Sequence, residues 1–150
     1  MSKIAVIPAR SGSKRLPKKN YKPFNSRTLV EIARDKCLAS GIFDKVIISS
    51  DDPVFEKLKN CKEVEFLLRN ENLAGDDATT DMVVDFFFKE LSSCDSILWV
   101  NSVSPLQSMQ DIKNCGLRLR STDVDCVMAV NTLYQHCCIA NKPLNFNPNN

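Results

Sequence analysis

The stretch "KIAVIPARSGSKRLPKKN" at residues 3–20 joins an apolar run to a strongly basic loop. The apolar run, residues 3–9, is too short for a buried helix and has a proline near its end, which predicts a strand. The loop that follows gathers basic side chains at Arg10, Lys14, Arg15, Lys18 and Lys19. Because ligands of open α/β sheets bind outside the carboxyl ends of the strands, this loop is placed to receive an anion.

The composition of the 150-residue chain is ordinary for a globular protein, with 43% hydrophobic and 25% charged residues. The formal net charge is only +2, so the basic loop indicates a local anion and no nucleic-acid partner. No run approaches the roughly 18 apolar residues of a membrane span, and the amino terminus is interrupted too soon for a signal peptide. We therefore expect a single domain over 1–150, in the cytoplasm and without a membrane partner.

Short apolar runs alternate with amphipathic segments along the rest of the chain. The runs predict strands at 44–50, 64–68, 96–101 and 125–131. The amphipathic segments predict helices at 28–41, 52–60, 79–93 and 108–121. Most strand runs are continuously apolar, as in parallel strands that are covered on both faces. The order predicts an α/β fold with three layers, α/β/α, around a mostly parallel Rossmann-like sheet, followed by an irregular tail at 141–150.

Local signals mark the helix ends. Thr28 with Glu31, and Ser108 with Asp111, have the spacing of capping boxes, and Gly41 is expected to end the first helix.

The seven cysteines form no C-x-x-C pair, which argues against a zinc site or a disulfide framework. The only histidine stands in "HCC" at 136–138. Neighbouring side chains rarely converge on one metal, so we assign no metal ligand there.

Three interpretations of the basic loop compete. It contains neither the G-x-x-x-x-G-K-[ST] of a P-loop nor the G-x-G-x-x-G of a dinucleotide site, so both standard phosphate loops are excluded. A solvated surface loop is the simplest interpretation that remains, because charge runs are usually solvated. The other is a different triphosphate loop, in which the backbone at Gly12 and Ser13 approaches phosphate oxygens. Arg10 and Lys14 would add charge-assisted hydrogen bonds.

Four segments resemble one enzyme family in order and spacing, and together they cover residues 3 to about 130. "IAVIPARSGSKRLPKKN" is similar to the first motif of the CMP-N-acylneuraminate synthetases, the cytidylyltransferases that activate sialic acids and related nine-carbon sugar acids. Its Lys14-Arg15 pair looks more like the pseudaminic-type branch. The other three segments are "DKVIISSDD" (44–52), "LLRNENLAGDDATTDMVVDFF" (67–87) and "VNSVSPLQ" (100–107).

The resemblance implies a nucleotide-diphospho-sugar transferase fold and a nucleotidyltransferase activity. The anomeric hydroxyl of the sugar acid attacks the α-phosphate of CTP, pyrophosphate leaves, and the protein mainly positions the substrates and stabilises charge. The residues implied at the phosphates and in catalysis are Arg10, Lys14 and Lys19, with Ser13 and Asn20 also at the nucleotide. Those implied at the cytidine are Arg69, Ala78 and Thr80. A plain helix start, capped by Asp77, Thr79 or Thr80, is an alternative that stays open for "DDATT".

The residues implied at the sugar acid are Asn101, Ser104 and Gln107. Here the sequence departs from the family pattern: Asn101 replaces a Gln, Ser102-Val103 replaces Pro-Thr, and Gln107 replaces an Arg. The last change removes a charge that could pair with the sugar carboxylate.

The family's catalytic domain usually runs to roughly 220 residues. The part beyond this chain normally supplies an acidic Asp-x-Asp site and an arm for dimerisation. The resemblance therefore implies Mg²⁺ and a homodimer, with the metal ligands outside residues 1–150. Asp51 and Asp52 could face the site, although a turn and a helix cap before Pro53 is the favoured interpretation.

Two other functions stay open. A short chain with an altered "NSVSPLQ" is also typical of a nucleotide-binding remnant without catalysis. A module that grips a polyanion such as RNA is disfavoured, because the single Trp99 lies in an apolar strand and no exposed aromatic residues interleave the basic loop.

Overall fold

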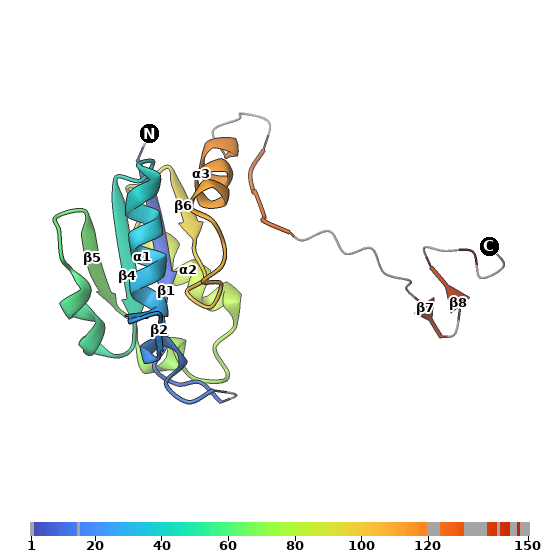
Figure 1. Ribbon diagram of the computed structural model, residues 1–150, viewed down its shortest axis with the longest axis horizontal. Coiled ribbons are helices and arrows are strands. Elements are labelled where there is room, and N and C mark those ends of the chain that lie inside the picture. The colour runs from blue at the N-terminus through green and yellow to red at the C-terminus, as the bar shows by residue number, and fades with distance from the viewer. Residues whose placement is uncertain are drawn as a thin grey trace.

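The computed structural model describes residues 2–14, 16–119, 124–130, 138–140, 142–144 and 147. Its central sheet has parallel strands in the order β5-β4-β1-β6 (Figure 1). These strands are β1 (Lys3–Pro8), β4 (Lys45–Ser50), β5 (Val64–Leu68) and β6 (Ser96–Trp99). The chain moves outward from β1 to β4 and β5 and then returns to the other side of β1 with β6. This reversal puts a crevice at the carboxyl ends of β1 and β6, where ligands of such sheets bind.

Helices cover both faces of the sheet, which confirms the predicted α/β class. The helices are α1 (Leu29–Ser40), α2 (Thr80–Glu90) and α3 (Met109–Arg118). The short 3₁₀ elements are η1 (Lys19–Tyr21), η2 (Pro53–Leu58) and η3 (Glu71–Leu73). Two antiparallel pairs of short strands complete the described elements: β2 (Pro23–Phe24) with β3 (Arg27–Thr28), and β7 (Cys138–Ile139) with β8 (Lys142–Pro143). No helix in the described ranges is long and apolar enough to cross a bilayer.

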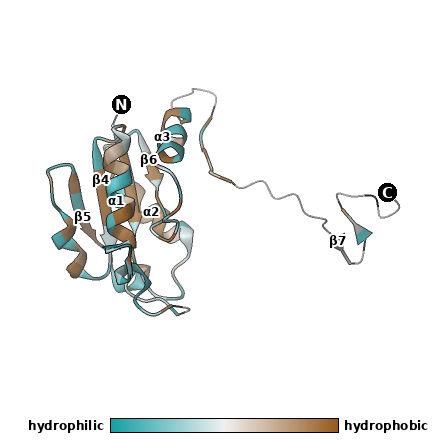
Figure 2. Cartoon of the chain, viewed as in Figure 1, coloured by the Kyte–Doolittle hydropathy of each residue, from teal (hydrophilic) through white to brown (hydrophobic). Residues whose placement is uncertain are grey.

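The core lies on both sides of the sheet, because successive strand residues point to opposite faces. One apolar cluster packs α1 and α3 against the sheet and includes Ile7, Ile48, Val30, Cys37 and Ile112. The other packs α2 against the opposite face and includes Ile4, Val6, Ile47, Val83 and Phe87. Figure 2 shows hydrophilic and hydrophobic residues side by side on α1 and α3, as expected for helices that turn one face to a sheet.

The predicted helix ends are confirmed. The Thr28 side chain accepts from the Glu31 backbone N–H at 3.2 Å, and the Glu31 carboxylate accepts from the Thr28 N–H at 2.7 Å. Ser108 and Asp111 form the same reciprocal pair at the start of α3. α1 ends at Gly41, whose φ of 65° lies in the left-handed region.

Three sequence expectations differ from the structure. The expected strand at 125–131 is wrong over its described part: residues 125–130 form no strand, because nothing in the described chain pairs with them. The expected helix at 52–60 is a 3₁₀ element, with Asp52 as the predicted cap accepting from the Val54 N–H at 2.9 Å. The strand expected at 96–101 stops at Trp99, where the chain turns into the crevice. Residues 136 and 137 of the "HCC" segment lie outside the described ranges.

Candidate active site

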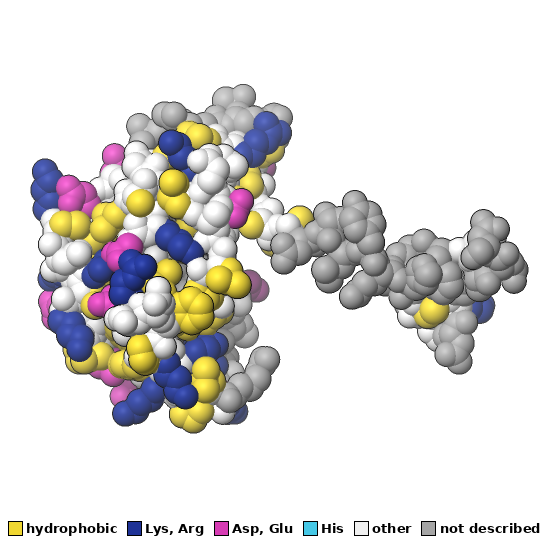
Figure 3. Space-filling model, viewed as in Figure 1, with side chains coloured by type: hydrophobic (Ala, Val, Ile, Leu, Met, Phe, Trp, Pro, Cys, Tyr) yellow, Lys and Arg dark blue, Asp and Glu magenta, His cyan; other side chains and the backbone are white. Residues whose placement is uncertain are grey.

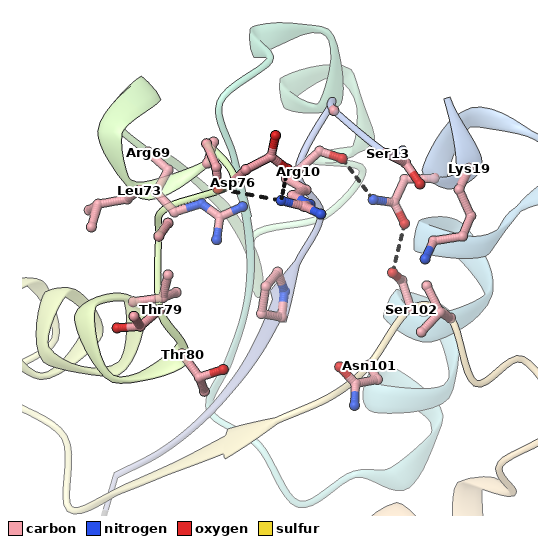
Figure 4. Close-up of a pocket in the computed structure, with 18 of the residues that line it drawn as sticks. Arg10, Ser13, Lys19, Arg69, Leu73, Asp76, Thr79, Thr80, Asn101 and Ser102 are labelled. Carbon is pink, nitrogen blue, oxygen red and sulfur yellow. Dashed lines mark hydrogen bonds and ion pairs between the residues drawn. The ribbon is translucent and has the colours of Figure 1, made fainter. Parts of the chain in front are cut away.

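A cavity of about 390 Å³ opens in the crevice at the carboxyl ends of β1 and β6 (Figure 4). Its walls come from the basic loop after β1, the end of β5, the segment that leads into α2, and the turn after β6. The residues predicted from the sequence that line it are Arg10, Ser13, Lys19, Asn20, Arg69, Ala78, Thr80 and Asn101. The structure thus brings together side chains that are more than 90 positions apart in the sequence.

Three predicted site residues lie outside this cavity wall. Lys14 extends into solvent, and its Nζ pairs with the Asp76 carboxylate at 2.8 Å. Ser104 and Gln107 lie beside a second, much smaller hollow between the turn after β6 and α1. There the Lys36 ammonium group donates to the backbone carbonyls of Pro105, at 2.5 Å, and Gln107, at 2.6 Å.

Two cations of the basic loop share the Asp76 carboxylate. Asp76 lies 2.8 Å from the Lys14 ammonium and 3.8 Å from the Arg10 guanidinium, which also donates to the Gly75 carbonyl at 3.4 Å. The hydrogen bond from Lys14, together with both positive charges, lowers the pKa of the Asp76 carboxyl. These groups are exposed, so the pairs themselves stabilise little. Figure 3 shows Lys and Arg side chains at the end of the molecule where the basic loop lies in Figure 1.

Asn20 ties the basic loop to the turn after β6. Its side-chain N–H donates to the Arg10 carbonyl at 2.9 Å, and its side-chain oxygen accepts from the Ser102 hydroxyl at 2.9 Å. Because a backbone carbonyl only accepts, these two contacts leave one orientation for the Asn20 amide. Both Asn20 and Ser102 are buried. The loop at β1 is therefore held in register with the loop at β6.

Arg69 follows β5 and is buried, with 5% of its surface exposed. Its backbone N–H donates to Ser50, but its side-chain Nε and Nη2 atoms have no hydrogen-bond partner. Burial lowers the pKa of its guanidinium, an effect that nearby Arg10 adds to and Asp51 opposes. Figure 4 shows Arg69 and Arg10 side by side at one end of the cavity. Buried donors without partners and a perturbed pKa are typical of a ligand site.

The start of α2 forms the opposite wall. The Thr79 side chain caps the helix by accepting from the Met82 N–H at 3.3 Å. Ala78 and Thr80 on either side of it line the cavity. The helix-start interpretation of "DDATT" is confirmed, and it coexists with the placement at the cavity. A helix amino terminus also favours negative charge beside it.

The acidic residues do not form a metal site in the described chain. The Asp51 carboxylate accepts from the Ser11 backbone N–H at 2.8 Å and from the Ser11 hydroxyl. Asp52 caps η2 and accepts from the Tyr21 hydroxyl at 2.5 Å, as the helix-cap interpretation predicts. Neither lines the cavity, and among the described residues no three metal-ligating side chains lie together. The donor set therefore does not fit a metal ion held by this part of the chain.

The cavity lining also contains residues that were not predicted as site residues, among them Asp76, Trp99 and Ser102. Asp76 lies inside the motif segment 67–87, and its place in that segment was the signal in the sequence that could have identified it. Ser102 was noted only as a departure from the family pattern, and its hydrogen bond spans 82 positions of sequence. Trp99 has the appearance of a core residue in an apolar run.

Comparison with known proteins gives three results. The family model for cytidylyltransferases matches residues 4–150 of the chain. An N-acylneuraminate cytidylyltransferase of Streptococcus agalactiae serotype V is 31% identical over 139 residues, which cover 91% of this chain and 33% of that protein. A pseudaminic acid cytidylyltransferase of Campylobacter jejuni serotype O:2 is 38% identical over 99 residues, which cover 65% of this chain and 42% of that protein. The chain thus spans between 33% and 42% of the length of these relatives.

A solved structure has the same fold. The structure of CMP:2-keto-3-deoxy-manno-octonic acid synthetase complexed with CTP matches with a TM-score of 0.67 at 21% identity. The match covers 82% of this chain and 49% of the other. It confirms the predicted nucleotide-sugar transferase type of α/β fold.

Proposed function

This chain belongs to the cytidylyltransferase family, and we propose that it binds CTP and transfers CMP to the anomeric hydroxyl of a nine-carbon sugar acid. The acceptor would be of the sialic, legionaminic or pseudaminic type. One observation carries the proposal: a basic loop, a buried arginine with unpartnered donors and a helix amino terminus surround one cavity. Such a cavity suits a triphosphate at one end and a base beside it.

The triphosphate would lie along the basic loop. Arg10 and Lys19 line the cavity. Lys14 does not line it, but its ammonium group pairs with Asp76, which does. Their positive charges would neutralise the phosphates and stabilise the charge that develops on the departing pyrophosphate. In the transfer, the sugar oxygen forms a bond to the α-phosphorus while the bond from that phosphorus to the β-phosphate bridging oxygen breaks. Pyrophosphate leaves with the electron pair, and the proton of the anomeric hydroxyl passes to solvent.

The cytidine would lie between Arg69 and the start of α2. Ala78 is small enough to let a base approach the backbone, and Thr80 offers a hydroxyl beside it. Ser13 and Asn20 complete the nucleotide set: Ser13 lines the cavity, and Asn20 holds the loop at Arg10.

The sugar acid would enter beside the turn after β6. Asn101 lines the cavity there, which supports its predicted role. The roles of Ser104 and Gln107 at the sugar acid remain predictions. Both residues lie beside the smaller hollow, so any effect they have on a sugar acid in the larger cavity would be indirect.

Three further expectations go with this function. Mg²⁺ is predicted from the family resemblance, with ligands outside the described residues, so we assign it no step. A cytoplasmic location is supported by the free state of the described cysteines and by the use of CTP. A homodimer is a prediction of the family resemblance alone.

One observation favours a second candidate function, CTP binding without transfer. Gln107 replaces an Arg of the family pattern, and Ser104 and Gln107 both lie outside the wall of the larger cavity. In that case CTP binds in the same cavity and no pyrophosphate is released.

The test measures CTP binding and pyrophosphate release separately. We expect CTP to raise the melting temperature more than UTP or ATP, and pyrophosphate to appear when N-acetylneuraminic or pseudaminic acid is added with Mg²⁺.

Lys14→Ala should weaken CTP binding by about 1.5–3 kcal/mol, the range for a charged hydrogen bond. Lys62→Ala, an exposed lysine outside the cavity, is the matched control. Equal stabilisation by all three nucleotides would contradict the proposal, and CTP binding without pyrophosphate release would favour the second candidate.

A further inference from the structure

Trp99 and Asn101 form a pair at the end of β6 that the proposed reaction does not yet use. Both line the cavity. The indole Nε1–H of Trp99 donates to the side-chain oxygen of Asn101 at 2.9 Å. The Trp99 ring packs edge-on against Phe87 of α2, with ring centroids 5.8 Å apart and planes at 66°. The ring is therefore fixed by the core on one side and presents its only polar atom to Asn101.

The chemistry of the indole decides how the Asn101 amide is turned. An indole N–H only donates, so the atom that meets it must be the amide oxygen and not the NH₂ group. With its oxygen engaged by Trp99, Asn101 has its two N–H donors left for the cavity. The pair as a unit offers the ligand hydrogen-bond donors.

We infer that Trp99 is a positioning residue that makes Asn101 a donor to an acceptor oxygen of the sugar acid, its carboxylate or an acyl carbonyl. The inference rests on the proposed function. Asn101 would thereby favour a substrate that presents an acceptor oxygen at this point, because both amide N–H donors are left for it, whereas the amide oxygen already accepts from Trp99 and has one lone pair left. A site that presents hydrogen-bond donors discriminates against a ligand without the matching acceptor.

The surroundings agree with an acceptor at this place. The cations that line the same cavity, Arg10, Lys19 and Arg69, favour an anionic substrate. Among the residues in its lining only Asp76 is acidic, and Asp76 is paired with Lys14.

The first test observes the hydrogen bond directly. Trp99 is the only tryptophan of the chain, so a ¹⁵N–¹H spectrum contains a single indole cross-peak. We expect Asn101→Ala to shift this cross-peak and speed its exchange with water, and Asn101→Asp, which keeps an acceptor oxygen, to leave it hydrogen-bonded. An indole resonance unchanged in Asn101→Ala would overturn the pairing.

The second test measures the sugar acid. Tryptophan fluorescence follows titrations of N-acetylneuraminic acid, and of a deaminated nonulosonic acid without the acyl group, at saturating CTP and with EDTA to prevent turnover. Asn101→Asp should weaken acid binding at least about tenfold, and by a larger factor than it weakens CTP binding. Trp99→Phe, followed by calorimetry, should do the same to a smaller extent. A loss for both acids identifies the carboxylate as the partner, and a loss for the acylated acid alone identifies the carbonyl.

The outcomes separate this inference from the proposed function. Failure of the wild-type protein to bind CTP would overturn the proposed function. CTP binding with equal acid affinity in wild type and Asn101→Asp, or with no binding of either acid, would overturn the inference and leave the nucleotide site standing.

Discussion

At the scale of single residues, two buried arginines differ in the use of their donors. Arg34 is paired: its guanidinium lies 2.7 Å from the Asp35 carboxylate and donates to the Leu58 carbonyl at 3.1 Å. Arg69 is as buried, yet two of its side-chain nitrogens have no partner. An unpartnered buried donor costs free energy in the folded state, which is why we propose that Arg69 binds a ligand.

Replacing Arg69 should therefore move stability and binding in opposite directions. We expect Arg69→Met to leave the free energy of unfolding unchanged or raise it by about 1 kcal/mol, because the buried unsatisfied donors are removed. CTP affinity should fall at least about tenfold, the loss of a charged hydrogen bond. Urea unfolding and calorimetric titration measure the two quantities.

Arg34→Met is the matched control. It breaks satisfied contacts outside the cavity, so it should lower stability by roughly 2 kcal/mol without changing CTP affinity. If Arg69→Met is instead as destabilised as Arg34→Met and binds CTP normally, Arg69 is a structural residue.

At the scale of the elements, the capping boxes set where α1 and α3 begin. The α1 box also brings a carboxylate to a helix amino terminus, where negative charge is favoured. The backbone hydrogen bond from Thr28 is the largest cause that lowers the pKa of Glu31, and it outweighs the opposing effect of burial. The box therefore predicts a pH-dependent contribution to stability.

The contribution of Glu31 should be present at neutral pH and lost in acid. A carboxyl whose pKa is lower in the folded state stabilises fully above its unfolded value, near 4.5, and loses this as the pH falls through the folded value. Glu31→Gln should lower stability at pH 7, and the difference from wild type should shrink as the pH falls below 4.5. Thr28→Ala should cost about 1 kcal/mol at pH 7.

Thermal unfolding between pH 3 and pH 7 checks this prediction. CTP affinity serves as the control measurement, because neither residue lines the cavity and both variants should bind CTP normally. A wild-type advantage over Glu31→Gln that is undiminished at pH 3 would contradict the assigned cause.

At the scale of the whole molecule, the core is formed by the four-stranded sheet and its three helices, and the segment 124–130 contributes little to it. Met128 and Val130 are each 77% exposed, whereas Ile112 of α3 is 2% exposed. The run "DCVMAV" is apolar like the core strands, but most of its side chains are exposed where those of the core strands are buried. Apolar sequence alone therefore does not place a run inside.

Substitutions should reveal this difference. Met128→Lys and Val130→Lys should change the free energy of unfolding by less than about 0.5 kcal/mol, because exposed side chains have little packing to lose. Ile112→Ala should cost about 2–5 kcal/mol through the cavity that it leaves. Denaturant unfolding of the three variants measures this. A destabilisation by Met128→Lys comparable to that of Ile112→Ala would show that the segment packs in solution.

Much of the fold could be predicted because its signals are local. The apolar run at 3–9, the capping pair Thr28–Glu31 and Gly41 act through neighbours within a few residues, and each holds in the structure. For the same reason the basic loop could be predicted as an anion site, since its charges and its place after β1 lie in one short stretch. The cavity residues from Arg10 to Asn101 could be named through motif segments, although their assembly required the fold.

What the sequence by itself determined is the set of elements, their order and the loop that supplies the positive charge. Only the tertiary structure decided that Arg69 is buried without partners, that Ser102 orients Asn20, that Trp99 turns Asn101, and that 125–130 is exposed and forms no strand. The physical reason is range. Capping and periodicity depend on neighbours along the chain, whereas burial and hydrogen-bond partners depend on which distant segments meet at the crevice between β1 and β6.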